Sequence, residues 1–301
     1  MGIHGLTKFL KSTAPESIET VSYGDLASKL TTCRPACVGI DVSSYLWPAQ
    51  YNTAAKGKGS YLRIFLDTIT TFWTAGLSVI CVFDGDTYTV AKKATVDKRS
   101  AVRQKNADDM VKIINRMTGG PPGAEAAESA SASATDTSTV ETISRADITK
   151  LSRNLISQGL GTADDRAELA RLEKKNISIT SNEIECLMYL LNSLGVPYLQ
   201  APHEADTLLA SLYRAGHICA VVSEDRDMLV HGVDTLICGL IDAPLRSSGQ
   251  VMICNLTAAL SSLDLTMAQF VDLCIMMGCD YCTKIAGVAA GKGLPLLRHH
   301  G

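Results

Sequence analysis

Acidic residues gather directly after an apolar stretch in the second half of the chain. The segment "VVSEDRDMLVHG" (221–232) begins like the end of a buried strand and continues with Glu224, Asp225 and Asp227 within four positions. Carboxylates in such a place repel one another and lose hydration, which raises the pKa of each unless a cation is near. The spacing therefore indicates a site that binds cations or performs acid chemistry.

Two further apolar segments end in an acid. Asp41 lies at the end of "CVGID" within 37–43, and Asp84 follows the apolar run of "LSVICVFDGD" (77–86). Ligands of an open parallel sheet bind beyond the carboxyl ends of its strands. Each acid taken singly could be a helix cap or a loop residue. Asp41, Asp84 and Asp225, each after an apolar strand, favour one shared site.

Three more acids are expected at the same edge. Glu204 and Asp206 open a helix that follows the strand "VPYLQA", and Asp280 comes just after a helix ends. So many carboxylates cannot all stay ionised without cations. Hard oxygen ligands suit Mg²⁺ or Mn²⁺, and two such ions can stabilise the attacking and leaving oxygens of a phosphoryl displacement. We therefore predict two ions bound by Asp41, Asp84, Glu204, Asp206, Asp225, Asp227 and Asp280.

The elements around these acids alternate between strands and helices. Apolar residues at helical spacing predict a helix over 61–75. Capping boxes at Thr180–Glu183 and Thr266–Gln269 predict the starts of two more helices. Strands buried on both faces and separated by helices predict an α/β fold whose central sheet is mostly parallel and flanked by helices.

The middle of the chain breaks this alternation. Residues 118–140 are rich in Gly, Pro, Ala, Ser and Thr and lack any basic residue or core-forming pattern, which predicts a disordered insertion. Basic residues gather on both sides of it, at 92–116 and 150–175. The formal net charge is −3, but without the seven candidate acids the chain is mildly basic, as expected of a protein that binds a phosphate backbone.

Composition excludes some classes of protein. No apolar run among the 301 residues approaches the roughly 18 residues of a membrane span, so we expect no membrane partner. The start has no signal-peptide pattern, and the ten cysteines are expected to be reduced thiols of an intracellular protein.

"CRPAC" (Cys33, Cys37) and "CDYC" (Cys279, Cys282) could be halves of a zinc site. The spacing of the first pair and the lack of a histidine cluster favour buried thiols.

Six motifs occur in an order that resembles a known family. "MGIHGLTKFL", "GIDVS", "VFDGD", "APHEAD", "SEDRDML" and "MGCDYC" resemble the flap endonuclease/XPG family of structure-specific 5′ nucleases. The resemblance covers 1–103 and about 180–295. It implies a PIN-like 5′-nuclease fold with a helical arch and a C-terminal helix-two-turn-helix. It also implies three blocks, with nuclease blocks at 1–103 and 180–301 and an arch region at 104–179 that holds the insertion.

The resemblance implies an activity. In the family, these acids bind two Mg²⁺ ions, for which Mn²⁺ can substitute, and the enzyme cleaves DNA at 5′ flaps, nicks, junctions and 5′ ends in replication, repair or recombination. Asp84 and Asp225 are then catalytic metal ligands. Lys92 and Arg99 correspond to a basic pair of the arch that contacts the scissile phosphate. The motifs mix features of the endonuclease and exonuclease branches, so the preference between them stays open.

The resemblance also implies DNA contacts outside the acids. Gly2 corresponds to a glycine near the active site, Trp47 to a ring that stacks on a base, and Arg103 extends the basic face. Trp47 could instead be a core residue, which would leave Tyr45 to stack. Gly287 matches the first glycine of a hairpin that grips duplex DNA through K⁺, but Ala289 replaces the second glycine, so the resemblance does not support K⁺ binding here.

Two other functions remain open from the sequence. A related metal-dependent ribonuclease would use the same acids, and a catalytically silent protein that binds DNA junctions would keep the fold. We further expect a monomer, located in the nucleus if the source is a eukaryote or a virus that replicates there. No convincing sliding-clamp motif is present in the sequence.

Overall fold

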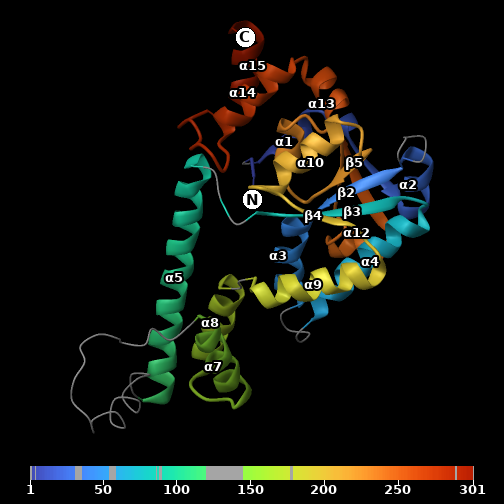
Figure 1. Cartoon of the computed structure of the whole chain (residues 1–301). Helices are drawn as coiled ribbons and strands as arrows, with labels where there is room; N and C mark the ends of the chain where they lie inside the picture. The colour runs from blue at the N-terminus through green and yellow to red at the C-terminus, as the bar shows by residue number, and fades with distance from the viewer. Residues whose placement is uncertain are drawn as a thin grey trace. The chain divides into compact units, whose positions relative to one another are not determined.

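The computed structural model describes residues 2–3, 5–30, 36–53, 59–85, 87, 90–119, 145–176, 179–288 and 290–300. The chain forms two compact units (Figure 1). One combines Met1–Thr95 with Ile179–Gly301, and the other is Val96–Ser178. The first unit contains most of both nuclease blocks expected from the sequence, and the expected boundary at 103 falls inside a helix, α5 (Val90–Thr118). Most of the insertion expected at 118–140 lies outside the described residues.

A seven-stranded sheet forms the centre of the first unit, in the order β1-β7-β6-β5-β2-β3-β4. Strands β2 to β6 pair in parallel, and β7 is antiparallel to both β6 and β1. The mostly parallel sheet expected from the sequence is confirmed. The antiparallel pairing of β7 at one side of the sheet was not expected from the sequence. The strands are β1 Ile18–Ser22, β2 Cys37–Asp41, β3 Ser78–Phe83, β4 Tyr198–Gln200, β5 Ala220–Val222, β6 Thr235–Cys238 and β7 Gln250–Asn255.

Successive strand residues point to opposite sides of the sheet. Both sides carry apolar residues, and helices cover both. Val222 contributes to a core with α2, α3, α4 and α9, whereas its neighbour Val221 contributes to a core with α1, α10, α13 and α14. The helices of this unit, apart from the start of α5, are α1 Leu6–Thr13, α2 Tyr23–Leu30, α3 Val42–Thr53, α4 Ser60–Thr74, α9 Ser181–Leu194, α10 Ala205–Arg214, α11 Asp227–Val230, α12 Ala243–Ser247, α13 Leu256–Leu263, α14 Met267–Met277 and α15 Ala290–His300, with the 3₁₀ turn η1 Pro15–Ser17.

Local signals in the sequence fix where several helices begin and end. The capping boxes at Thr180–Glu183 and Thr266–Gln269 are both formed, with each side chain bonded to the other residue's backbone N–H. Gly195 ends α9 in the left-handed conformation, with φ 67°. These boundaries set the position of the loops that follow each helix.

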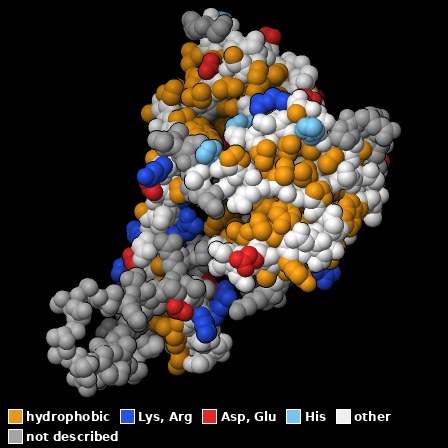
Figure 2. Space-filling model, viewed as in Figure 1, with side chains coloured by type: hydrophobic (Ala, Val, Ile, Leu, Met, Phe, Trp, Pro, Cys, Tyr) orange, Lys and Arg blue, Asp and Glu red, His pale blue; other side chains and the backbone are white. Residues whose placement is uncertain are grey.

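The second unit is a small helical assembly. It contains the part of α5 from Val96 onward, α7 Arg145–Ser157 and α8 Ala163–Lys175. Its apolar core includes Met110, Ile114 and Leu169. Figure 2 shows basic side chains along α5 with acidic side chains among them. The basic segment expected at 92–116 is therefore a mixed surface, because it also carries Asp97, Asp108 and Asp109.

No single described helix is long and apolar enough to cross a membrane. Helices α13 and α14 pass the same test only as a pair, on length and composition, with a bend of 86° between them. Both helices contribute side chains to the core beneath the sheet, including Leu256 and Phe270.

Candidate active site

The acids expected to meet do follow adjacent strands. Asp41 is the last residue of β2, and Asp84 directly follows β3. Asp225 and Asp227 follow β5, which pairs in parallel with β2 on the side opposite to β3. Asp41 is 4% exposed and Asp227 is 7% exposed. Three neighbouring parallel strands therefore deliver carboxylates to the carboxyl edge of the sheet.

The amino end of α10 brings two more acids to the same edge. Glu204 is the residue before the helix and is 2% exposed, and Asp206 lies in its first turn. Asp84 Oδ1 accepts the Ala205 N–H at 2.8 Å, which ties α10 to the end of β3. Free N–H groups and the helix dipole make a helix amino end favourable for carboxylates. The position of α10 thus lowers the cost of gathering them.

A serine that the sequence analysis passed over links two of the strands. Ser223 Oγ donates to Asp41 Oδ2 at 2.9 Å and accepts the Asp225 N–H at 3.0 Å. Asp41 Oδ1 also accepts the Ser44 N–H at 3.2 Å. Ser223 directly precedes the acidic run, and this position was the one feature of the sequence that could have marked it as a site residue. It fixes the orientation of Asp41 relative to Asp225.

The acids of the cluster repel one another and are largely removed from water. Burial, followed by the charge of Asp84, raises the pKa of Asp41 to about 6. Burial, followed by the charge of Asp225, raises the pKa of Asp227 to about 7. Burial, followed by the charges of Asp41 and Asp225, raises the pKa of Asp206 well above its usual range. A bound cation would relieve all three groups.

The carboxylates are close enough to shift one another's pKa but are not gathered as ligands around one point. Among the described residues, no group of three or more His, Cys, Asp or Glu side chains is arranged to hold a metal ion. The zinc alternative likewise has no support in the described part of the chain, and Cys33 lies outside it. Cys279 and Cys282 face each other, with their sulfurs 3.4 Å apart. The donor set fits a hard divalent cation in chemistry and charge.

One basic residue already contacts a candidate ligand. Lys92 Nζ, in the first turn of α5, donates to Glu204 Oε2 at 2.6 Å, and Tyr281 Oη donates to the same oxygen at 2.7 Å. Burial lowers the pKa of Lys92, but the hydrogen bond and the charge of Glu204 outweigh burial, so the pKa is raised overall. Burial, followed by the bond to Glu204, raises the pKa of Tyr281. Tyr281 directly follows Asp280, but no sequence pattern predicted its contact with Glu204.

The first residues of the chain lie against the acids. Ile3 N–H donates to Asp227 Oδ1 at 2.8 Å. Gly2 has φ 87°, and a Cβ built on it would lie 2.1 Å from Asp225 Oδ1 and 2.6 Å from Asp227 Oδ1. Only glycine fits this position without displacing a carboxylate.

Two family models match the two halves of the site. The XPG N-terminal domain matches residues 1–106, and the XPG I-region matches residues 195–280. Together they cover more than half of the chain and contain all seven candidate acids. The chain belongs to the XPG family.

Similar proteins of this family are known as flap endonucleases. Flap endonuclease 1 of Glycine max is 29% identical over 311 residues, which cover 100% of this chain and 67% of the relative. Flap endonuclease 1 of Cryptosporidium parvum (strain Iowa II) is 27% identical over 321 residues, covering 100% of this chain and 54% of the relative. The chain thus spans about half to two thirds of the length of these curated relatives.

Solved structures of the same kind share the fold. The catalytic core of Rad2 in complex with DNA substrate matches 99% of this chain and 68% of that chain, with 16% identity and a TM-score of 0.61. Flap endonuclease-1 from Methanococcus jannaschii matches 94% of this chain and 74% of that chain, with 20% identity and a TM-score of 0.54. The 5′-nuclease fold expected from the sequence is therefore confirmed.

The residues expected to contact DNA in this XPG-family chain lie on several elements. Trp47 is half-buried on α3, whereas Tyr45 is 1% exposed and belongs to the core. The alternative in which Tyr45 stacks on a base is therefore wrong. Arg99 and Arg103 lie in the second unit, one turn apart on α5, where Arg103 Nε donates to the Arg99 carbonyl at 3.4 Å.

The C-terminal helix pair has the expected connection. Helices α14 and α15 are joined by a turn that contains Gly287, which is exposed and has φ 76°. That backbone conformation favours glycine, as expected for a tight hairpin. Ala289 lies outside the described residues.

One acid of the opening motif has a structural role. Glu224 Oε1 accepts the Gly239 N–H at 2.8 Å, and its other oxygen lies 3.8 Å from Arg226 Nη1. The hydrogen bond from Gly239 ties the end of β5 to the loop after β6. Glu224 is therefore separate from the seven candidate ligands.

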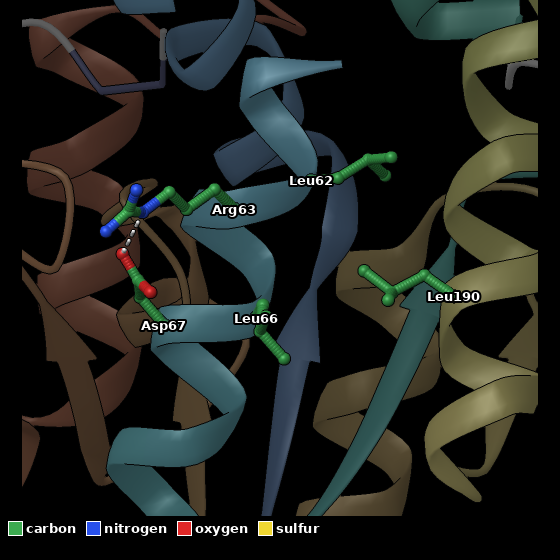
Figure 3. A pocket seen from close by; sticks show the side chains of 5 residues that line it. All are labelled: Leu62, Arg63, Leu66, Asp67 and Leu190. Carbon is green, nitrogen blue, oxygen red and sulfur yellow. Dashed lines mark ion pairs between the residues drawn. The ribbon is translucent and has the colours of Figure 1, made fainter.

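A shallow pocket lies away from these acids on the same unit. Figure 3 shows Leu62 and Leu66 of α4 facing Leu190 of α9, with Arg63 beside Asp67. Arg63 Nε lies 4.0 Å from Asp67 Oδ2. The pocket contains none of the candidate ligands, so it is distinct from the candidate active site.

Proposed function

We propose that this chain is a divalent-metal-dependent nuclease that cleaves DNA phosphodiesters at 5′ flaps, nicks and junctions and from 5′ ends. The observation that carries the proposal is that β2, β3, β5 and α10 bring buried and half-buried carboxylates to one edge of the sheet, in a chain of the XPG family. The proposal extends to DNA replication, repair or recombination in the nucleus, by a monomer. The nuclear part is supported by the two curated relatives named above, which are flap endonucleases of eukaryotes.

The residues proposed to hold two Mg²⁺ ions, or Mn²⁺ in their place, share one property: each is a carboxylate at the carboxyl edge of the sheet or beside it. Bound ions of this kind supply a nucleophilic water at neutral pH and stabilise charge on the attacking and leaving oxygens. The raised pKa values of Asp41, Asp206 and Asp227 support cation binding. The proposed ligands are Asp41, Asp84, Glu204, Asp206, Asp225, Asp227 and Asp280.

The chain's own basic and aromatic groups are proposed to bind and orient the DNA. Lys92 and Arg99 are seven residues apart on α5 and therefore on one helix face, where both could contact the scissile phosphate. A cation aimed at that phosphate stabilises charge that grows in the transition state. Trp47 is proposed to stack on a base, and Arg103, Gly2 and Gly287 are proposed to lie along the DNA.

A product-mapping assay tests the proposal. Purified protein is incubated with end-labelled flap, nicked, blunt and single-stranded DNA, and with RNA flaps of the same sequence, in Mg²⁺ or in EDTA. The proposal predicts metal-dependent cleavage near the 5′ junction of the DNA substrates. Preferential cleavage of RNA would instead identify a ribonuclease. Tight junction binding without turnover in either Mg²⁺ or Mn²⁺ would identify a binding protein.

A further inference from the structure

Three side chains from separate parts of the chain meet at one carboxylate oxygen. Glu204 Oε2, at the amino end of α10, accepts hydrogen bonds from Lys92 Nζ at 2.6 Å and from Tyr281 Oη at 2.7 Å. The Glu204 side chain is 3% exposed and that of Lys92 is 18% exposed. Lys92 Nζ also lies 6.0 Å from the centre of the Tyr281 ring, within the range of a cation–π contact. A proposed metal ligand is thus paired with an internal cation.

The turn that carries Tyr281 is held in place from both sides. Cys279 N–H donates to the Cys282 carbonyl at 3.1 Å, which closes the turn around Asp280 and Tyr281. Thr95 Oγ1 donates to the Asp280 carbonyl at 2.5 Å. Thr95 is three residues after Lys92, so both project from one side of α5. The start of α5 and this turn therefore form one fixed support for the Tyr281 ring and hydroxyl.

We infer that Tyr281 is a positioning residue of the active site that, together with Lys92, occupies Glu204 while divalent metal is absent. The inference rests on the proposed function. A divalent cation needs the carboxylate oxygen to which Lys92 and Tyr281 donate, so the two kinds of partner compete. A cation held by Glu204 would displace the Lys92 ammonium, and the Tyr281 ring would keep that ammonium nearby. The released ammonium is then free to contact a phosphate.

Lys92 and Tyr281 together fix the carboxylate of Glu204. Glu204 cannot turn toward its carboxylate neighbours while it accepts two charge-assisted hydrogen bonds. Removing the Tyr281 hydroxyl therefore weakens the state that excludes metal and leaves every proposed ligand in place. A hydrogen bond to a charged group has a strength that corresponds to roughly a tenfold change in an equilibrium constant.

Metal titration without DNA provides the first test. Isothermal titration with Mn²⁺ compares the unmodified protein with Tyr281→Phe and with Tyr189→Phe, a control at an exposed position of α9. We expect Tyr281→Phe to bind Mn²⁺ about tenfold more tightly, because its ring remains and only the hydroxyl is lost. Tyr189→Phe should match the unmodified protein. Unchanged or weaker binding by a folded Tyr281→Phe protein overturns the inference, and thermal unfolding confirms the fold.

A second readout needs no variant. Lysine acetylation mapped by mass spectrometry, with and without Mn²⁺, reports how strongly Lys92 is paired. We expect Mn²⁺ to increase the reactivity of Lys92 and to leave Lys29, which pairs with Glu19, unchanged. Equal Lys92 reactivity in both conditions overturns the inference. If the unmodified protein binds no divalent cation at all, the proposed function fails as well, whereas normal metal binding with unresponsive Lys92 and Tyr281 overturns only the inference.

Discussion

Gly2 lies directly against the carboxylate of Asp225. A methyl group built on Gly2 would come within 2.1 Å of Asp225 Oδ1, closer than two unbonded atoms can approach. The next residue donates its N–H to Asp227 at 2.8 Å. The second residue of the chain is thus in contact with a site whose remaining acids come from strands far along the sequence.

Gly2→Ala is expected to slow single-turnover DNA cleavage by at least about tenfold, because the added methyl group must displace Asp225 or Asp227 from its place in the site. The control is Gly5→Ala. Gly5 also has a positive φ, 75°, but nothing lies within 4 Å of its Cβ position. Equal rates for the two variants would show that backbone strain, and not contact with the acids, determines the effect.

Asp84→Asn and Asp225→Asn are each expected to abolish cleavage in Mg²⁺, since each removes a charged metal ligand. Junction binding should be retained or improved, because DNA phosphates would meet less negative charge. Gel-shift and single-turnover assays separate the two effects. Glu224→Gln is the matched control within the same motif and should retain cleavage, because its oxygens bond Gly239 and Arg226. Near-normal cleavage by either Asn variant would exclude the two-metal assignment.

The sequence predicted the sheet, the strand ends and the helix caps because each depends on local pattern. Asp41, Asp84 and Asp225 follow apolar strands, and Thr180 and Thr266 form their capping boxes within four residues. Tyr281 could not be predicted from the residues alone, because its contact with Glu204 spans 77 positions and depends on how the turn after α14 packs. The alternative role of Tyr45 could not be decided from the sequence, because its burial depends on how α3 packs against the sheet and not on its spacing from Asp41.

Metal-free protein is expected to lose stability as the pH rises from about 4 to about 7. Asp41 and Asp227 have a usual pKa of 3.8, raised to about 6 and about 7 in the folded state. The folded state therefore binds more protons than the unfolded state across this range, so the free energy of unfolding falls with rising pH. Thermal unfolding in EDTA across pH 4 to 8 measures the trend.

Asp227→Asn provides the control for this pH dependence. The amide cannot ionise but can still accept the Ile3 N–H, so the variant should be more stable than the unmodified protein near pH 7. We expect a gain of at least about 1 kcal/mol, which corresponds to roughly 2–4 °C in Tm for a domain of this order of size. A variant with the same slope as the unmodified protein would show that Asp227 does not carry the raised pKa.

Lys92→Ala and Arg99→Ala are each expected to slow single-turnover cleavage by at least about tenfold, with smaller effects on substrate affinity, because a cation aimed at the scissile phosphate acts mainly in the transition state. Lys93→Ala, at an exposed neighbouring position of α5, is the control. If the first two variants lose affinity but keep the single-turnover rate, Lys92 and Arg99 contribute only general attraction to the DNA backbone.

Trp47 is expected to stack on a DNA base, which leads to a fluorescence test. It is half-buried on α3, the helix that begins directly after Asp41. Stacking of a base on an aromatic ring contributes about 1–3 kcal/mol. In a Trp73→Phe background, which leaves one tryptophan, a 5′-flap substrate titrated in Ca²⁺ should quench the emission of Trp47. Trp47→Ala should slow cleavage and keep a cooperative unfolding transition. Absence of quenching, together with a large loss of stability in Trp47→Ala, would assign Trp47 to the core beside Tyr45 and leave the stacking position to another residue.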